Sequence, residues 1–107
     1  MKRTVQWSRD ALNDLNGQIA FIAADSPAAA RRVADRIRDT GKSLGDMATG
    51  RPGRVVDTYE KPVQGLSFVI AYAIVPTVHG EAVTILRVIH TSRDWRPGEW
   101  PDRERHR

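Results

Sequence analysis

The sequence contains no cysteine, so disulfide scaffolds, cysteine nucleophiles and thiolate metal sites are all excluded. It also lacks a long apolar run. The longest, Phe68 to Val75, has the length of a strand, whereas a membrane-spanning helix needs about 18 apolar residues. The basic residues at the N-terminus are not followed by the apolar core of a signal peptide. These absences predict a cytoplasmic protein that does not enter a membrane.

Acidic residues are outnumbered, with 13 Asp and Glu against 17 Lys and Arg, which gives a formal net charge of +4. Residues 1–54 carry most of this excess, and residues 55–92 carry none of it. The basic balance favours an acidic partner, either a protein or a nucleic acid. A length of 107 residues and a hydrophobic content of 40% indicate one globular domain.

Two helices are predicted in the first half of the chain. The first runs from Ser8, a good N-cap residue, to Ala24, and the second runs from Pro27 to Leu44 behind the cap Ser26. The residues predicted to face the core recur at three- and four-residue spacing: Leu12, Leu15, Ile19 and Ile22 in the first helix, and Ala30, Val33, Ile37 and Leu44 in the second. The short link makes the pair an antiparallel hairpin.

The second half is predicted to form strands, because the hydrophobic period changes to two. Strands are expected at Val55–Glu60, Leu66–Val75 and Ala82–His90, after a loop at residues 45–54 and with a hairpin turn at residues 76–80. Together with the alternating run Thr4–Trp7, this order (β-α-α-β-β-β) predicts an α+β domain, in which a helical hairpin packs on a small, mainly antiparallel sheet.

Three segments resemble, in order, parts of the RelE/ParE toxins, the toxic halves of bacterial toxin–antitoxin pairs. Residues 7–15 (WSRDALNDL) resemble the family's strand-to-helix opening, residues 50–55 (GRPGRV) its loop into the sheet, and residues 85–95 (ILRVIHTSRDW) its closing strand and basic turn. The resemblance implies a toxin domain at residues 1–96, followed by a partly disordered tail at residues 97–107.

This resemblance implies a growth-inhibiting toxin of the plasmid-stabilisation type, neutralised by a cognate antitoxin, and it leaves the target open. RelE-like members cut messenger RNA on the ribosome without a metal, and ParE-like members inhibit DNA gyrase. A third alternative is a domain that binds an antitoxin but is not toxic. Whether the chain is an enzyme therefore depends on its target, and the antitoxin-binding residues cannot be named from the sequence.

For a metal-independent ribonuclease, the best catalytic candidates are His90 and Arg93. An imidazole can exchange a proton near neutral pH and a guanidinium can hold a phosphate, which are the two tasks that the reaction requires. Arg51, Arg54 and Lys61 are possible helpers. The alternatives are that His90 is a strand-end histidine bonded to a carbonyl, and that Arg93 forms a surface ion pair.

The sequence departs from the pattern of the family's nucleases. Those enzymes commonly carry basic residues on the first strand after the loop, where this chain has only Lys61, and an arginine near the position of Phe68. Many relatives also have glycine and arginine where this chain has Asp57 and Tyr59. The thin basic cluster favours gyrase over messenger RNA as the target.

For a gyrase inhibitor, the predicted target-binding residues are Arg93, Trp95 and Trp100, because Trp and Arg are favoured anchors of protein interfaces. The alternative is that the two tryptophans cover a sheet edge or the core. Neither His79 nor His106 has a second ligand at metal-binding spacing, so no metal and no cofactor are expected.

Overall fold

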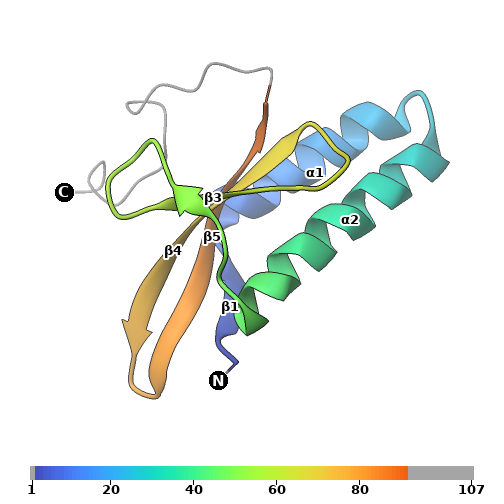
Figure 1. Cartoon of the computed structure of the whole chain (residues 1–107). Helices are drawn as coiled ribbons and strands as arrows, with labels where there is room; N and C mark the ends of the chain where they lie inside the picture. Colours follow the sequence, from blue (N-terminus) through green and yellow to red (C-terminus); the bar gives the residue numbers. More distant parts are fainter. Residues whose placement is uncertain (1, 92–107) are drawn as a thin grey trace.

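A helical hairpin packs against a five-stranded sheet in the computed structural model, which describes residues 2–91 (Figure 1). The elements in chain order are β1 (Thr4–Trp7), α1 (Arg9–Ala23), α2 (Pro27–Asp46), β2 (Arg51–Pro52), β3 (Tyr59–Pro62), β4 (Phe68–Thr77) and β5 (Gly80–His90). The predicted α+β class and the predicted order of strands and helices are confirmed, with one additional two-residue strand, β2.

The strand order in the sheet is β1-β5-β4-β3-β2. Only β1 runs parallel to its neighbour, β5, and the other three pairings are antiparallel. The longest pairing joins β4 to β5 through a turn at Val78 and His79. The predicted strand Ala82–His90 therefore lies inside the sheet, with a partner on each side.

Both helices begin where the sequence predicts. The hydroxyl of Ser8 accepts the backbone N–H of Ala11 at 3.0 Å, and the hydroxyl of Ser26 accepts that of Ala29 at 3.1 Å. These caps satisfy N–H groups that have no partner within the helix. They fix the points at which the chain enters α1 and α2.

The core lies between the hairpin and one face of the sheet. Leu15 of α1 and Ile37 of α2 are fully buried there, together with residues of β4 and β5: Phe68, Ile70, Tyr72, Val83, Ile85 and Val88. Leu12 is an exception among the predicted core residues, because 44% of it is exposed. At the start of α1 it is Ala11 that takes the buried position.

The close contact between α2 and β1 depends on two glycines one turn apart. A Cβ at Gly45 would lie 2.7 Å from the backbone oxygen of Arg3, and one at Gly41 would lie 2.8 Å from the ring of Trp7. The N–H of Arg3 also donates to the carbonyl of Gly45 at 2.7 Å. The helix α2 continues to Asp46, beyond the predicted end at Leu44.

The predicted strand Val55–Glu60 is wrong in position, because its first half is a turn. Thr58 donates both its N–H and its hydroxyl to the carbonyl of Val55, and Asp57 has a φ of 65°. A left-handed residue cannot continue an extended strand. The strand that does form, β3, therefore starts only at Tyr59.

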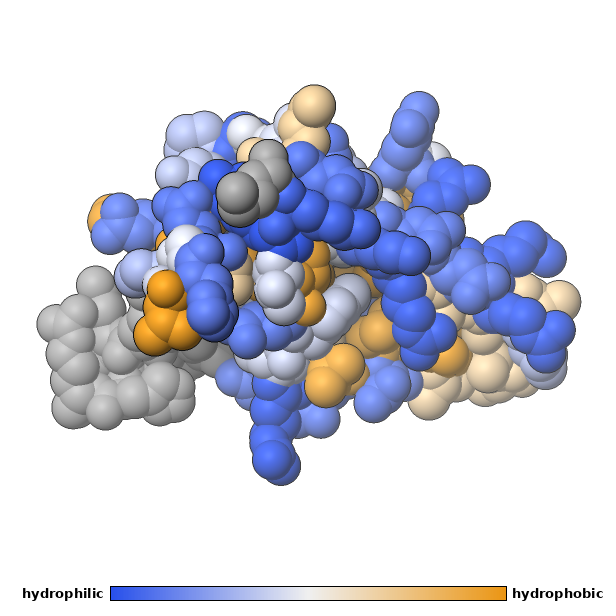
Figure 2. Space-filling model, turned by 90° about the horizontal axis from the view of Figure 1, so that it is seen from below, coloured by the Kyte–Doolittle hydropathy of each residue, from blue (hydrophilic) through white to orange (hydrophobic). Residues whose placement is uncertain are grey.

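The surface of the molecule is mixed. The face seen in Figure 2 is mostly hydrophilic, with smaller hydrophobic areas between the charged side chains. Across residues 2–91 the large hydrophobic residues with substantial exposure are Leu12, Phe21, Met47, Val56, Tyr59 and Val78. Among these, Phe21 on α1 is 80% exposed.

Candidate functional site

A buried carboxylate organises the β2–β3 end of the sheet. Glu60, only 3% exposed, accepts the backbone N–H of Arg54 at 3.1 Å and its Nε at 2.9 Å, and the guanidinium of Arg51 lies 3.6 Å away. Burial by itself raises the pKa of Glu60, but the hydrogen bonds from Arg54 and the charges of both arginines outweigh it, so the pKa is lowered. Arg54 is thus part of a structural ion pair that holds the loop at residues 50–58.

Lys61 lies on the same strand but is engaged elsewhere. Its Nζ donates to the hydroxyl of Thr49 at 2.8 Å, and the hydroxyl of Tyr72 donates to the carbonyl of the same threonine at 3.1 Å. The ring of Tyr72 stacks on Tyr59, with 5.5 Å between centroids. Burial raises the pKa of Tyr72, and the neighbouring Tyr59 adds to this effect. Tyr72 therefore serves packing and hydrogen bonding in the core, as a neutral phenol.

His90 ends β5 and packs on the core side of the sheet. It pairs with Phe68 in the β4–β5 register, and the two rings meet edge to face with 5.2 Å between centroids. Phe68 belongs to the main core cluster, so His90 lies on the face that the helices cover. This environment is that of a packed strand-end histidine.

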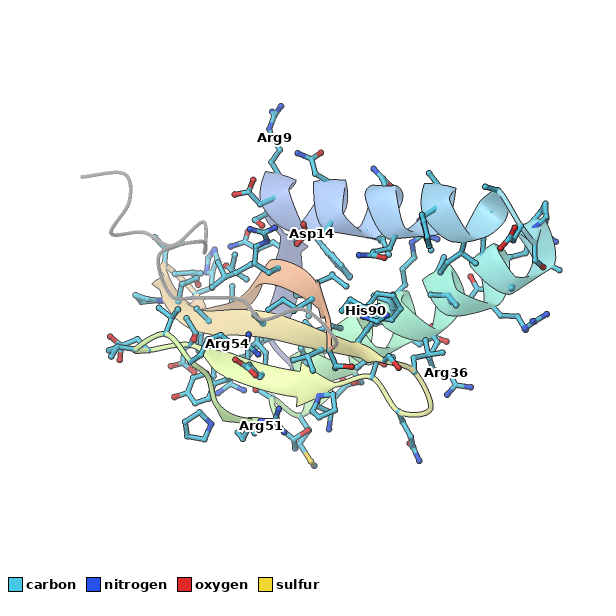
Figure 3. The ribbon with its side chains drawn as sticks, turned by 90° about the horizontal axis from the view of Figure 1, so that it is seen from above. Arg9, Asp14, Arg36, Arg51, Arg54 and His90 are labelled. Carbon is cyan, nitrogen blue, oxygen red and sulfur yellow. The ribbon has the colours of Figure 1, made fainter. Side chains whose placement is uncertain are left out.

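The sheet separates the predicted catalytic helpers. Glu60 is paired with Ala71, which faces away from the main core cluster, so the arginines bound to Glu60 lie on that opposite face. Lys61 pairs with the core residue Ile70 and shares the face of His90, but its strand is two places from β5. Figure 3 shows the positions of Arg51, Arg54 and His90. Among the candidates within residues 2–91, the structure does not bring these side chains together around one phosphate-sized space.

The remaining candidates lie outside the described residues. These are the second catalytic candidate, Arg93, the two other predicted target-binding residues, Trp95 and Trp100, and the predicted tail at residues 97–107. They remain predictions.

An ion pair between α1 and β5 was not predicted from the sequence. Asp14 accepts two hydrogen bonds from the guanidinium of Arg87 and a third from the N–H of Val88 at 3.0 Å. The β4–β5 register shifts at this point, so that Tyr72 pairs with Ile85 while Ala71 pairs with Arg87. The signal in the sequence was Asp14 itself, an acid three residues after the buried Ala11.

Ser8, at the start of α1, contacts the same register shift, which is a β-bulge in β5. The N–H of Ser8 continues the β1–β5 pairing by donating to the carbonyl of Ile85 at 2.9 Å, and the hydroxyl of Ser8 donates to the carbonyl of Leu86, the unpaired residue of the bulge, at 3.1 Å. Backbone groups that a bulge removes from the ladder need such partners. Figure 3 shows Asp14 on the side of α1 that faces the sheet and Arg9 on the opposite side.

Within residues 2–91, no three His, Asp or Glu side chains are grouped so that they could hold a metal ion. In the same part of the chain, neither helix is both long and apolar enough to cross a membrane.

Comparisons with known proteins identify the family. Residues 5–95 match the model of the ParE toxin of the type II toxin–antitoxin system parDE. The chain is 34% identical over 95 residues to "Putative toxin Y4kP" of Sinorhizobium fredii, an alignment that covers 88% of this chain and 94% of that protein. It is also similar to a chain of the chromosomal ParDE toxin–antitoxin system from P. aeruginosa, with a TM-score of 0.71 and 22% identity over 83% of this chain and 96% of that one. This chain belongs to the RelE/ParE toxin family, as a ParE-type toxin of a type II toxin–antitoxin system.

Proposed function

We propose that this chain arrests bacterial growth by inhibiting DNA gyrase, and that a cognate antitoxin neutralises it. The choice of target rests on one observation, the positions of the ribonuclease candidates that lie within residues 2–91. Arg51 and Arg54 lie on one face of the sheet with Glu60, and His90 packs against Phe68 on the other. A ribonuclease needs its acid–base group and its cations around one phosphate. A protein-binding inhibitor has no such requirement, so the arrangement supports gyrase over messenger RNA.

The target-binding residues of this proposal are Arg93, Trp95 and Trp100. Arg93 and Trp95 fall near the end of a toxin domain that we propose at residues 1–96, and Trp100 falls in the tail that follows it. The antitoxin is expected to lie across the helical hairpin and a sheet edge.

The deciding experiment runs two assays on the same purified chain. We expect inhibition of gyrase supercoiling in the absence of RNA, relieved by the protein encoded next to it. Cleavage of messenger RNA in a ribosome-dependent assay, with supercoiling unaffected, would establish the RelE-like alternative. Normal growth of cells that contain soluble chain would establish the non-toxic alternative.

A further inference from the structure

An open pocket of about 400 Å³ lies on the sheet where β4 and β5 extend past the end of α2 (Figure 1). It is lined by Arg3, Asp57, Tyr59, Ile74 and Glu81. Tyr59 pairs with the core residue Tyr72, and Ile74 packs against the main core cluster, so both lie on the face that the helices cover. The pocket is therefore on the opposite face of the sheet from Glu60 and its two arginines.

The charges in this pocket do not balance. Asp57 is exposed, and across residues 2–91 its carboxylate forms no hydrogen bond or ion pair. Glu81 accepts both hydrogen bonds from Arg3, of 3.1 and 2.8 Å, on the same oxygen, Oε1. Its other oxygen, Oε2, accepts none from the described residues. Glu81 thus neutralises Arg3, and Asp57 gives the pocket a net negative charge.

Tyr59 adds an aromatic surface to the two carboxylates. One face of its ring stacks on Tyr72, with 5.5 Å between centroids, and the residue is 37% exposed. An aromatic ring attracts a cation, and a planar guanidinium also stacks on it. Carboxylates accept the N–H groups of a guanidinium through charge-assisted hydrogen bonds. A ring beside two carboxylates therefore suits an arginine side chain better than a lysine side chain.

The loop that carries Asp57 is fixed by its own hydrogen bonds. The N–H of Gly53 donates to the carbonyl of Thr58 at 2.8 Å, and Thr58 donates its N–H and its hydroxyl to the carbonyl of Val55. Val56, next to Asp57, is 80% exposed. A group that is already fixed loses less conformational entropy when a partner binds. The loop therefore presents a preorganised carboxylate beside an exposed apolar side chain.

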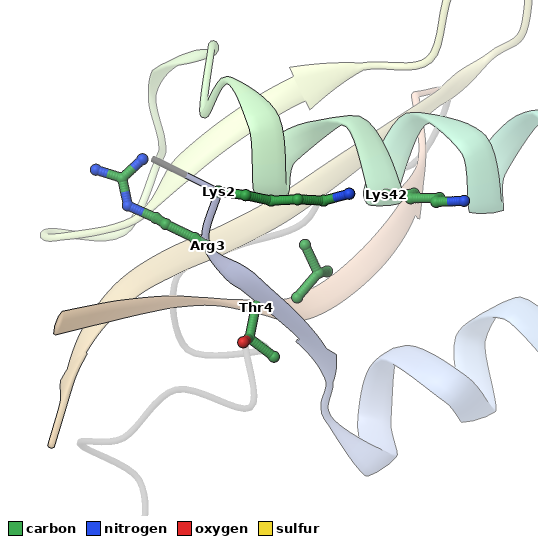
Figure 4. Close-up of a pocket in the computed structure, with 5 residues that line it drawn as sticks. Lys2, Arg3, Thr4 and Lys42 are labelled. Carbon is green, nitrogen blue, oxygen red and sulfur yellow. The ribbon is translucent and has the colours of Figure 1, made fainter. Parts of the chain in front are cut away.

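A neighbouring pocket shares Arg3 but has the opposite charge. It is also about 400 Å³ in volume and is lined by Lys2, Arg3, Thr4, Val5 and Lys42, none of which is acidic (Figure 4). In Figure 4 the guanidinium of Arg3 points away from the ammonium groups of Lys2 and Lys42. The two lysines repel a cation, so a basic side chain is favoured only in the pocket that contains Asp57.

We propose that the pocket beside Asp57 binds an arginine side chain of the target protein. The guanidinium would lie against the ring of Tyr59 and donate to Asp57 and to Oε2 of Glu81, while Val56 packs on the surface of the partner. Naming the target as the source of the arginine rests on the proposed function, in which the antitoxin lies across the helical hairpin and a sheet edge. The preference for a guanidinium does not depend on that function.

Titration of the full chain with N-acetylarginine amide, followed by NMR, tests the ligand chemistry without gyrase. We expect saturable shifts of the backbone amides of Asp57, Tyr59 and Glu81, and weaker binding of N-acetyllysine amide. Asp57→Asn keeps the shape of the side chain and tolerates the left-handed backbone, and it should weaken binding of the arginine amide by about threefold or more.

The matched control is Asp25→Asn, which removes the same charge at an exposed position between the two helices. It should bind the arginine amide as the wild type does. Equal losses in the two variants would show a general charge effect and overturn the proposal. So would the absence of shifts at the three amides.

Gyrase assays test the source of the arginine. Asp57→Asn should inhibit supercoiling about tenfold less strongly than the wild type, while its affinity for the antitoxin stays within about twofold. Unchanged inhibition would overturn the assignment to the target. A loss of antitoxin affinity, or of self-association shown by the wild type, would assign the pocket to the antitoxin or to a second copy instead. If the wild type does not inhibit gyrase, the proposed function fails, and the titration still decides whether the pocket binds a guanidinium.

Discussion

Asp14 and Arg87 are 73 residues apart in the chain, yet two charge-assisted hydrogen bonds of 2.7 and 2.8 Å join them across the α1–β5 contact. The side chain of Asp14 is 15% exposed and that of Arg87 is 14% exposed. The same carboxylate accepts the N–H of Val88 just past the register shift in β5. One side chain thus fixes the position of α1 and completes the hydrogen bonding of the bulge.

Asp14→Ala should destabilise the protein by about 2–4 kcal/mol, because it removes the carboxylate that accepts two hydrogen bonds from the largely buried guanidinium of Arg87 and one from the N–H of Val88. The measurement is the free energy of unfolding in urea. Asn13→Ala, at an exposed position of the same helix, should change it by less than about 0.5 kcal/mol. Equal effects of the two variants would contradict this role for Asp14.

Gly45→Ala should cost about 1–3 kcal/mol, because the new Cβ would press on the backbone oxygen of Arg3, which cannot rotate away. Gly17→Ala is the matched control. Gly17 lies in α1 with nothing within 4 Å of a built Cβ, so the change should stabilise the protein by about 0.5–1 kcal/mol. The two thermal unfolding midpoints should therefore move in opposite directions, and a shared direction would disprove the close α2–β1 contact.

Glu60 should make stability depend on pH. Its pKa in the folded state lies below its ordinary value of 4.5, so the ionised form stabilises the fold above that value. This contribution should decline as the pH falls from about 4.5 toward the lowered pKa. In Glu60→Gln the decline should be smaller than in the wild type when unfolding in urea is measured across that range. Parallel pH profiles would show that the Glu60–arginine cluster contributes nothing.

Leu15→Ala and Ile37→Ala should each cost about 2–5 kcal/mol, because both side chains are fully buried between the helices and the sheet. Leu12→Ala removes the same atoms as Leu15→Ala from a position that is 44% exposed. Its cost, measured by unfolding in urea, should be less than half that of Leu15→Ala. A larger cost at Leu12 would mean that α1 is rotated about its axis.

His90→Ala should leave gyrase inhibition within about threefold of the wild type, because the proposed mechanism asks no proton transfer of this side chain. If the chain instead cuts messenger RNA with His90 as its acid or base, the variant should lose about a hundredfold in cleavage. The two assays on wild type and variant, with antitoxin binding as the control for folding, separate these outcomes.

The helices could be predicted from the sequence because local signals agree there: a capping serine, an apolar row and, at Pro27, a residue suited to the first turn. The strand predicted from Val55 was wrong because the prediction gave more weight to the two valines, which favour strands, than to Asp57. The left-handed backbone of Asp57 turns the chain before Tyr59. A glycine at this position would have indicated the turn, since glycine adopts a positive φ without strain.

The site was less predictable than the fold, because its contacts join distant parts of the chain. Spacing alone could not show that Arg51 and Arg54 share Glu60 on one face of the sheet while His90 lies on the other. Alternation assigns residues to faces within one strand, but only the register between strands decides which of them meet. The sequence shows an acidic residue at position 14, but only the fold shows that the partner of Asp14 is Arg87.

The pairing of β1 with β5 has a consequence for the order in which parts of the toxin can fold during synthesis. Gln6 meets Thr84, 78 residues later, so the first strand has no sheet to join until nearly all of the described chain has been synthesised. Contacts between such distant residues form slowly, since the loop must close first. Until β5 is made, Trp7 can contact Gly41 of α2, but its strand has no neighbour with which to form a sheet.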